Sequence, residues 1–259
     1  MENKKDRIGS QSDGMMVFGV HPVLEAIESG KEIDRVFLQR NISGPAANSL
    51  RQLMRERGIR PVEVPIEKLN RLTRSNHQGV VAFITEVNYY PLADVVPALF
   101  ETGRVPLILM LDRITDVRNF GAICRSAECM GVGAVLVPYR GGAPANGDAM
   151  KASAGAMSRI TICREHNLKD AIDYLKDSGF MVVGCSEKGA LPIYQADLAG
   201  PLCIIMGSEE DGISPEYLKR CDEVLKIPMM GSVGSLNVSV AAGMFLYEIS
   251  RQHSLRSPK

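Results

Sequence analysis

The sequence predicts an α/β protein of two domains, a small N-terminal one and a larger C-terminal one. Three observations support this fold class: short apolar stretches alternate with helix-like patterns, a segment of different composition interrupts the alternation at 88–105, and glycine-rich turns follow the late apolar stretches. A chain of 259 residues that is 45% hydrophobic is long and apolar enough for one or two sizeable cores.

The first domain, at 16–87, is predicted to be a compact module of helices and strands. Its second helix has an amphipathic pattern that ends at Gly58. The expected elements are helices at 22–27, 46–57 and 66–71 and strands at 35–38, 61–64 and 80–84.

The segment at 88–105 is predicted to connect the two domains. It contains Pro91, Pro97 and Gly103, no lysine and one arginine. Because proline and glycine interrupt regular structure, this linker is expected to hold one short helix.

The second domain, at 106–253, is predicted to be a parallel sheet covered on both faces, because apolar strands alternate with helices. Asn167 and Ser214 suit the cap positions of two of these helices, and Ser214 precedes a proline. The expected strands lie at 107–111, 134–137, 181–185, 202–206 and 224–227, and the helices at 121–130, 148–156, 168–176, 215–220 and 238–250.

The polar ends at 1–15 and 254–259 are expected to be tails. No secretory signal and no apolar run near the roughly 20 residues that span a bilayer is present, so a cytoplasmic protein without a membrane partner is expected. The six cysteines form no Cys-x-x-Cys pair and the four histidines show no ligand spacing, which favours reduced thiols and argues against a metal site.

Charge is unevenly distributed although the formal net charge is zero. The segment at 40–74 carries eight basic residues against three acidic ones. This excess indicates either a phosphate-facing surface or helix faces that are simply solvated, and charge alone does not decide between them.

Glycine-rich turns make the late part of the chain a candidate ligand site. The usual nucleotide fingerprint, Gly-x-Gly-x-x-Gly, is absent, because the turn after the 107–111 strand reads Asp-Arg-Ile-Thr-Asp-Val. Instead, Gly-Ser-Glu-Glu-Asp-Gly follows the strand at 202–206, and Met-Met-Gly-Ser-Val-Gly-Ser-Leu-Asn follows the strand at 224–227. Such turns leave main-chain N–H and C=O groups free where a ligand can come close.

With the upstream segment at 112–125, these turns resemble, in order, the three motifs of the SpoU family, the S-adenosylmethionine-dependent methyltransferases that modify RNA at the ribose 2′-hydroxyl. The resemblance covers essentially 107–250. It implies a trefoil-knot methyltransferase domain, which is an exception to the rule that chains do not thread their own loops. The stretches at 18–27 and 76–82 resemble the start and end of the small RNA-binding domain that precedes many SpoU catalytic domains.

By this resemblance, S-adenosyl-L-methionine binds at the main chain of Gly207, Ile227 and Leu236. Backbone groups there suit the adenine edges, and the Ile227 and Leu236 side chains would give the pocket apolar walls. The alternative is that these two side chains are ordinary core residues.

The resemblance also ties Arg125 to catalysis, and the family's arginine has been viewed as the base that accepts the hydroxyl proton. A guanidinium has a pKa above about 12 and stays protonated, so an alternative role is to hold a phosphate and stabilise the developing alkoxide. A surface ion pair with Glu128 is the third interpretation.

Four further motif positions complete the candidate catalytic set: Asn119, Glu209, Ser235 and Asn237. Glu209 is expected to hold Arg125 or Asn119 in place or to accept a hydrogen bond from the ribose, although acidic loops are usually just solvated. Ser235 and Asn237 also suit a helix N-cap, and both roles can coexist. Val117 stands where the family often has proline.

The implied activity is methyl transfer to a ribose 2′-hydroxyl in structured RNA. The N-terminal domain favours a guanosine of 23S rRNA, because transfer-RNA enzymes of the family usually lack such a domain. The alternatives are a tRNA 2′-O-methyltransferase and a non-catalytic RNA-binding or ribosome-assembly factor.

Two further surface features follow from the same resemblance. Family members are homodimers through the knotted domain, so Met244, Phe245 and Tyr247 are candidates for an interface or for the core. Arg140 and Lys151, in and after a flexible loop, are candidate phosphate contacts.

Overall fold

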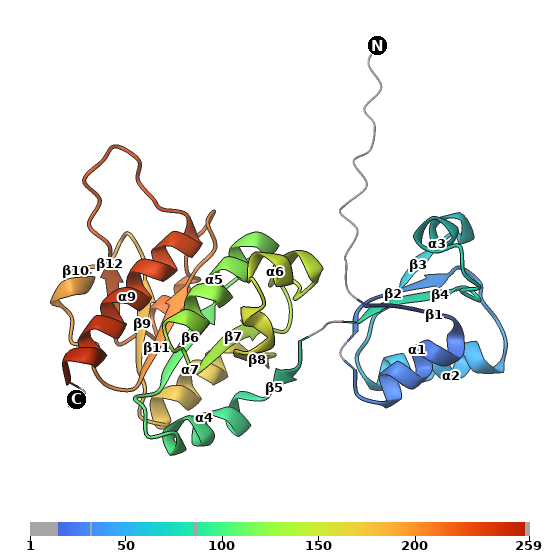
Figure 1. The fold of residues 1–259 in the computed structure, drawn as a ribbon, viewed down its shortest axis with the longest axis horizontal. Helices are drawn as coiled ribbons and strands as arrows, with labels where there is room; N and C mark the ends of the chain where they lie inside the picture. The colour runs from blue at the N-terminus through green and yellow to red at the C-terminus, as the bar shows by residue number, and fades with distance from the viewer. Residues whose placement is uncertain (1–14, 32, 85–86, 257–259) are drawn as a thin grey trace, which may run out of the picture. The chain divides into compact units, whose positions relative to one another are not determined.

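The computed structural model describes residues 15–31, 33–84 and 87–256 (Figure 1). The chain divides into two compact units, with the boundary between residues 86 and 87. The tail expected at 1–15 lies outside the described residues except for Met15, which begins a strand.

The first unit is a four-stranded sheet with helices on both faces. Its strands follow the order β1-β4-β2-β3, so that β4, which is buried at every position, lies at the centre. In chain order its elements are β1 (Met15–Phe18), α1 (Val20–Glu28), β2 (Ile33–Gln39), α2 (Pro45–Glu56), β3 (Val62–Val64), α3 (Ile66–Leu72) and β4 (Val80–Ile84).

Alternate residues of β2 supply two separate cores in this unit. Val36 and Leu38 pack with α1 and α2, whereas Phe37 packs on the opposite face with Leu69 of α3. Four of the eight basic residues at 40–74 therefore lie on helices on opposite faces of the sheet, and the other four lie in connecting segments. All eight except Arg51 are exposed.

The turn at His77 is held by side-chain hydrogen bonds. The buried imidazole accepts a bond from the Gly79 N–H at Nδ1 (3.0 Å), and its Nε2 lies 2.8 Å from Asn70 Oδ1. Gln78 Oε1 accepts the N–H of Val20, the first residue of α1 (3.3 Å). The Asn-His-Gln-Gly segment at 76–79 therefore fixes the start of β4 against α1.

The second unit is built on one eight-stranded sheet with the order β10-β12-β9-β11-β6-β7-β8-β5, in which every pair is parallel. Its strands are β5 (Tyr89–Tyr90), β6 (Leu107–Leu111), β7 (Ala134–Pro138), β8 (Thr161–Glu165), β9 (Met181–Cys185), β10 (Leu191–Pro192), β11 (Leu202–Met206) and β12 (Glu223–Lys226). Its helices are α4 (Leu92–Glu101), α5 (Val117–Cys129), α6 (Gly147–Ala152), α7 (Leu168–Asp177), α8 (Pro215–Leu218) and α9 (Val238–Arg256), with short 3₁₀ turns η1 (Ala156–Ser158) and η2 (Ile193–Gln195).

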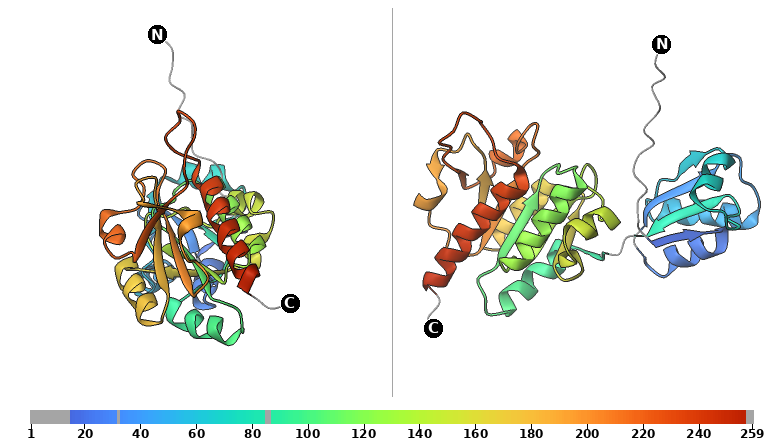
Figure 2. Two further views of the ribbon diagram at one scale, coloured as in Figure 1. Left: turned by 90° about the vertical axis from the view of Figure 1, so that its left-hand side faces the viewer. Right: turned by 45° about the horizontal axis from the view of Figure 1, so that its top comes forward.

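Helices cover both faces of this sheet (Figure 2). Leu109 and Leu111 of β6 pack with α5 and α9, and the alternate residues Ile108 and Met110 pack with α4 and α7. The central strands β6 and β11 are buried at every position, as the apolar runs of the sequence predicted.

Several elements differ from their sequence predictions. The segment at 88–105 is more than a connection, since β5 pairs with β8 and Leu92, Val95 and Val96 of α4 enter the core of the second unit. Helix α5 begins at Val117 rather than at residue 121, because Asp116 Oδ1 accepts the N–H groups of residues 118 and 119. Helix α9 extends to Arg256, through much of the tail expected at 254–259.

Both predicted cap positions are correct, but only Asn167 caps with its side chain, which accepts the N–H of Lys169 (3.1 Å). Ser214 is the N-cap residue of α8, yet its hydroxyl donates to Asp112 instead (2.7 Å).

All six cysteines are free thiols, and only Cys129 is exposed. Burial raises the pKa of Cys124 to about 12 and that of Cys221 to about 11. Within the described residues, three or more His, Cys, Asp or Glu side chains nowhere gather as metal ligands would. None of the described helices is long and apolar enough to span a membrane.

Candidate active site at the carboxyl edge of the parallel sheet

The three motif segments meet because they follow parallel strands of one sheet. The loops after β6, β11 and β12 all leave from the carboxyl ends of their strands, where α/β sheets form ligand sites. The fold therefore brings motifs that are far apart along the chain to the carboxyl edge of one sheet.

The turn after β11 requires glycine at residue 207. A Cβ atom built there would lie 2.1 Å from the carbonyl carbon of Gly212 and 2.2 Å from the nitrogen of Ile213. Both are backbone atoms, so no side-chain movement relieves the contact. Hydrogen bonds between Ser208 and Gly212 close the turn in both directions (3.1 and 2.9 Å). The turn is therefore compact, with its backbone in close contact across it.

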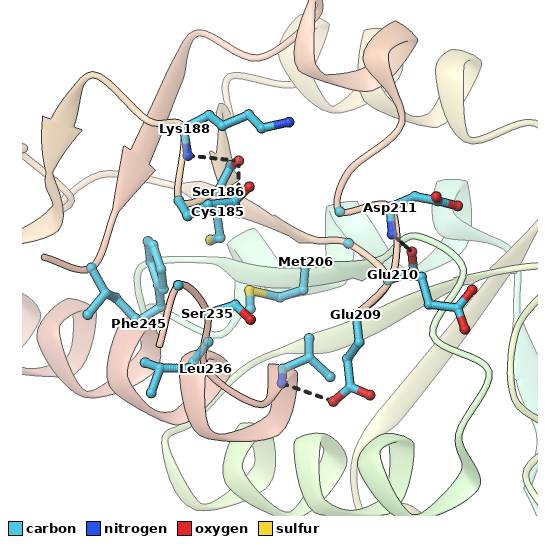
Figure 3. A pocket seen from close by; sticks show the side chains of 18 of the residues that line it. Cys185, Ser186, Lys188, Met206, Glu209, Glu210, Asp211, Ser235, Leu236 and Phe245 are labelled. Atoms are coloured by element: carbon cyan, nitrogen blue, oxygen red, sulfur yellow. Dashed lines mark hydrogen bonds between the residues drawn. The ribbon is translucent and has the colours of Figure 1, made fainter. Parts of the chain in front are cut away.

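A cavity of about 340 Å³ lies beside this turn. All three residues expected to bind the methyl donor line it, Gly207, Ile227 and Leu236. Met206, Leu236 and Phe245 contribute apolar side chains, and Ser186, Ser235 and Glu209 contribute polar ones (Figure 3). Ile227 and Leu236 are both half-buried, and Ile227 also packs against the core.

Three predicted catalytic residues form one hydrogen-bonded cluster. Asn119 and Asn237 each donate from Nδ2 to Glu209 Oε1 (2.9 and 2.8 Å), and Asn237 Nδ2 also lies 3.0 Å from Asn119 Oδ1. The same Glu209 oxygen accepts the N–H of Val238 at the start of α9 (3.4 Å; Figure 3). Glu209 thus joins the first turns of α5 and α9 to the turn after β11.

Asn237 has the second role that the sequence suggested. Its Oδ1 accepts the N–H of Ser239 (2.9 Å) and the N–H of Val240 (3.4 Å), which is the pattern of a helix N-cap. Because one end of the amide caps α9 and the other end bonds Glu209, the two roles coexist. Ser235 lines the cavity two residues earlier.

Arg125 lies apart from this cluster. It is exposed on α5, lines neither of the two cavities at the site, and makes no hydrogen bond or ion pair with a described residue, Glu128 included. Six positions at about 100° each place it about 120° around the helix from Asn119. The structure therefore leaves this guanidinium available to a group from outside the described chain.

Two residues that the sequence did not single out hold the site together. The buried Asp112 accepts both the N–H and the hydroxyl of Ser214 (2.7 Å each). Arg113 bonds Asp112, Asp211 and the carbonyl of Gly212 (3.1 Å each), and the bond to Asp112 is the main reason that the pKa of Arg113 is raised. In the sequence, the only indication of this role was that two charged residues directly follow a buried strand.

A second cavity, of about 300 Å³, adjoins the first. Both are lined by Ser208, Glu209 and Val238, but only the second reaches Asp116 and Asn119. Glu209 therefore stands between two adjoining cavities, each lined by both polar and apolar groups, and the first is large enough for a small molecule.

Comparison with known families matches both units. The model of the SpoU rRNA Methylase family matches residues 106–247, and that for RNA 2′-O ribose methyltransferase substrate binding matches residues 16–90.

Individual relatives are similar over nearly the whole chain. A putative TrmH family tRNA/rRNA methyltransferase of Staphylococcus saprophyticus is 35% identical over 93% of this chain and 96% of its own. An uncharacterized tRNA/rRNA methyltransferase of Synechocystis is 34% identical over 94% of this chain, which spans 64% of that longer relative. The crystal structure of an AdoMet-bound rRNA methyltransferase from Sinorhizobium meliloti is similar with a TM-score of 0.60 and 26% identity, over 92% of this chain and 87% of the other.

Proposed function

The chain belongs to the SpoU rRNA methylase family, and on that basis we propose that it transfers a methyl group from S-adenosylmethionine to a ribose 2′-hydroxyl of RNA. The observation that carries the proposal is the position of Glu209 between the two cavities, bonded to Asn119 and Asn237. The first unit binds the RNA and the second holds both reactants. The trefoil knot implied by the family is part of this proposal.

The cavity beside Gly207 fits the methyl donor. Its 340 Å³ is within the range of about 300–1,000 Å³ that small-molecule sites occupy. Leu236 and Phe245 give apolar surface for an adenine, and the main chain at Gly207, Ile227 and Leu236 gives donors and acceptors for its edges. When bound there, S-adenosylmethionine supplies an electrophilic methyl group.

The polar residues orient the ribose. Asn119 and Asn237 direct their N–H groups to Glu209 Oε1, which leaves Oε2 without a hydrogen bond from any described residue. Oε2 accepts the hydrogen bond of the attacking hydroxyl and so fixes its direction. As the oxygen–methyl bond forms, the sulfur–methyl bond breaks to leave S-adenosylhomocysteine, and the hydroxyl proton passes to water. Arg125, which lines neither cavity, remains protonated and holds an RNA phosphate.

The preferred substrate is a guanosine in 23S rRNA. What supports this choice over a transfer RNA is the presence of the substrate-binding unit, which transfer-RNA enzymes of the family usually lack. The free cysteines suit a cytoplasmic protein, where thiols stay reduced.

Incubation with labelled S-adenosylmethionine tests the proposal. Purified 23S, 16S and transfer RNA are each used as acceptor, and the RNA is digested to nucleosides. We expect label in 2′-O-methylguanosine from 23S RNA. Label in transfer RNA would retain the reaction and overturn the substrate, whereas donor binding without any transfer would favour a non-catalytic RNA-binding or assembly factor.

We also propose that the protein is a homodimer through the outer face of α9. Met244 (45% exposed) and Tyr247 (62% exposed) lie there beside the exposed Tyr194 and line an apolar cavity of about 550 Å³. Phe245, by contrast, is 2% exposed and belongs to the core. Exposed apolar groups of this extent are typical of an interface.

A charge on this face should separate the two copies. Tyr247→Lys is expected to shift the mass measured by light scattering from dimer to monomer, because a lysine would be buried without a partner. Val105→Lys, at an exposed valine before β6, is the matched control and should leave the dimer intact. A monomeric wild-type protein would refute the assignment.

A further inference from the structure

A stack of planar side chains lies at the carboxyl edge of the sheet, outside the site described above. Tyr139 follows β7 and His166 follows β8, and their rings are stacked with centroids 4.0 Å apart and an interplanar angle of 29°. The N–H of Tyr139 donates to the carbonyl of Glu165 (2.8 Å), which extends the pairing of the two strands to the stacked residues. The stack is thus held by the sheet itself.

The guanidinium of Arg164 lies close to this stack. The guanidinium carbon of Arg164 lies 3.2 Å from the ring centre of Tyr89 and 5.6 Å from that of Tyr139. Glu165, the residue after Arg164, accepts the N–H of Leu92 at its Oε1 (2.8 Å). The cluster therefore presents aromatic and cationic groups together.

The outer part of the stack is open to solvent. Tyr139 and His166 are both exposed, and His166 makes no hydrogen bond to a described residue. A polar cavity of about 410 Å³ adjoins them and is also lined by Arg140, Asn167 and Tyr217. Exposed, pre-stacked rings beside a cation are the features with which proteins hold unpaired bases.

The stack is continuous with the methyl-transfer site. Arg140 lines the cavity beside His166, and the next residue, Gly141, lines the cavity that contains Asn119. Strand β8 lies two positions from β6 in the sheet, which at about 4.8 Å per strand is roughly 10 Å. A nucleotide close to the one held at Glu209 can span this distance.

We propose that Tyr139 and His166 form a stacking platform for an unpaired base of the RNA that flanks the methylated nucleotide, with Arg140 contacting its phosphate. The proposal rests on the proposed function, in that the RNA is the substrate. It adds a binding site within the second unit, independent of the substrate-binding unit. The platform requires a target in a loop or bulge, since a paired base offers no free face.

Initial rates of methyl transfer at varied concentrations of the accepting RNA test the platform. His166→Ala and Tyr139→Ala should each raise KM for the RNA about 5- to 100-fold, the loss expected for one base stack, with kcat changed less than about twofold. His166→Phe keeps a flat ring and should retain wild-type KM. Tyr90→Ala removes an exposed tyrosine from β5 that makes no ring contact with a described residue, and should behave as wild type.

Direct binding separates failure of the platform from failure of the proposed function. A single-stranded RNA carrying 2-aminopurine is titrated with each variant, because stacking quenches the fluorescence of this base. Quenching by wild type and His166→Phe that is lost in His166→Ala supports the platform even if no RNA is methylated. Equal KM and equal quenching in His166→Ala and Tyr90→Ala would refute it, whether or not methyl transfer occurs.

Discussion

Replacing Arg125 with alanine is expected to lower kcat for methyl transfer by about 100-fold, because the RNA phosphate that it holds positions the ribose and a misplacement of about 1 Å costs on the order of that factor. The change should not affect folding, because the side chain is exposed and has no hydrogen bond or ion pair within the described residues. Surface substitutions of this kind alter the free energy of unfolding by about 0.5 kcal/mol or less. The measurements are single-turnover methyl transfer, calorimetric titration of the donor and thermal unfolding.

Two further variants make this result specific. Arg125→Lys keeps the charge but loses the planar fork that binds a phosphate, so it should recover only a small part of the rate. Arg104→Ala removes an exposed arginine just before β6, at the amino edge of the sheet and away from the site, and should leave the rate unchanged. Wild-type kcat in Arg125→Ala would contradict the catalytic assignment and return Arg125 to a solvated helix face.

Gly207→Ala should affect an earlier step, the binding of S-adenosylmethionine. Its methyl group would meet the backbone of Gly212 and Ile213 at 2.1–2.2 Å, so the turn after β11 must move. That turn carries Glu209 and forms a wall of the donor cavity. Each backbone hydrogen bond to the donor that the displaced turn loses costs up to about 1.5 kcal/mol, or about tenfold, so we expect a loss of about 100-fold in donor affinity.

A neighbouring glycine provides the control for this variant. Gly231 lies in the loop after β12 with no atom within 4 Å of an added Cβ, so Gly231→Ala should bind the donor as wild type does. Calorimetric titration gives both dissociation constants, and thermal unfolding shows whether Gly207→Ala is folded. An unchanged affinity in folded Gly207→Ala would mean that the donor binds elsewhere.

The sequence predicted five of the eight strands of the second unit's sheet and missed β5, β8 and β10. Strands at 107–111 and 202–206 were located to the residue, because a strand buried on both faces is an unbroken apolar run. β8 was missed because it ends in Arg164 and Glu165, whose charges lie at the sheet's edge among partners from β5 and α4. β5 and β10 were missed because each is only two residues long.

The site was predicted as a set of residues but not as an arrangement. Motif resemblance named Asn119, Glu209 and Asn237, yet Glu209 was expected to hold either Arg125 or Asn119, and the structure has only the second contact. The role of Arg113 in holding the turn could not be predicted from the sequence, because Arg113 has a backbone φ of +57°, which an arginine rarely adopts. The partner of Glu209 and the role of Arg113 both depend on tertiary packing, which a local sequence pattern does not reveal.

The cluster around Glu209 also dictates when the enzyme becomes complete during its synthesis. Asn119 bonds Glu209, 90 positions later, and Asn237, 118 positions later. A ribosome adds about 5–20 residues per second, so roughly 6–24 s pass between the synthesis of Asn119 and that of Asn237. The strands and helices of the first unit end at Ile84, so they can form long before then. A chain whose translation stops early therefore carries a finished first unit and no active site.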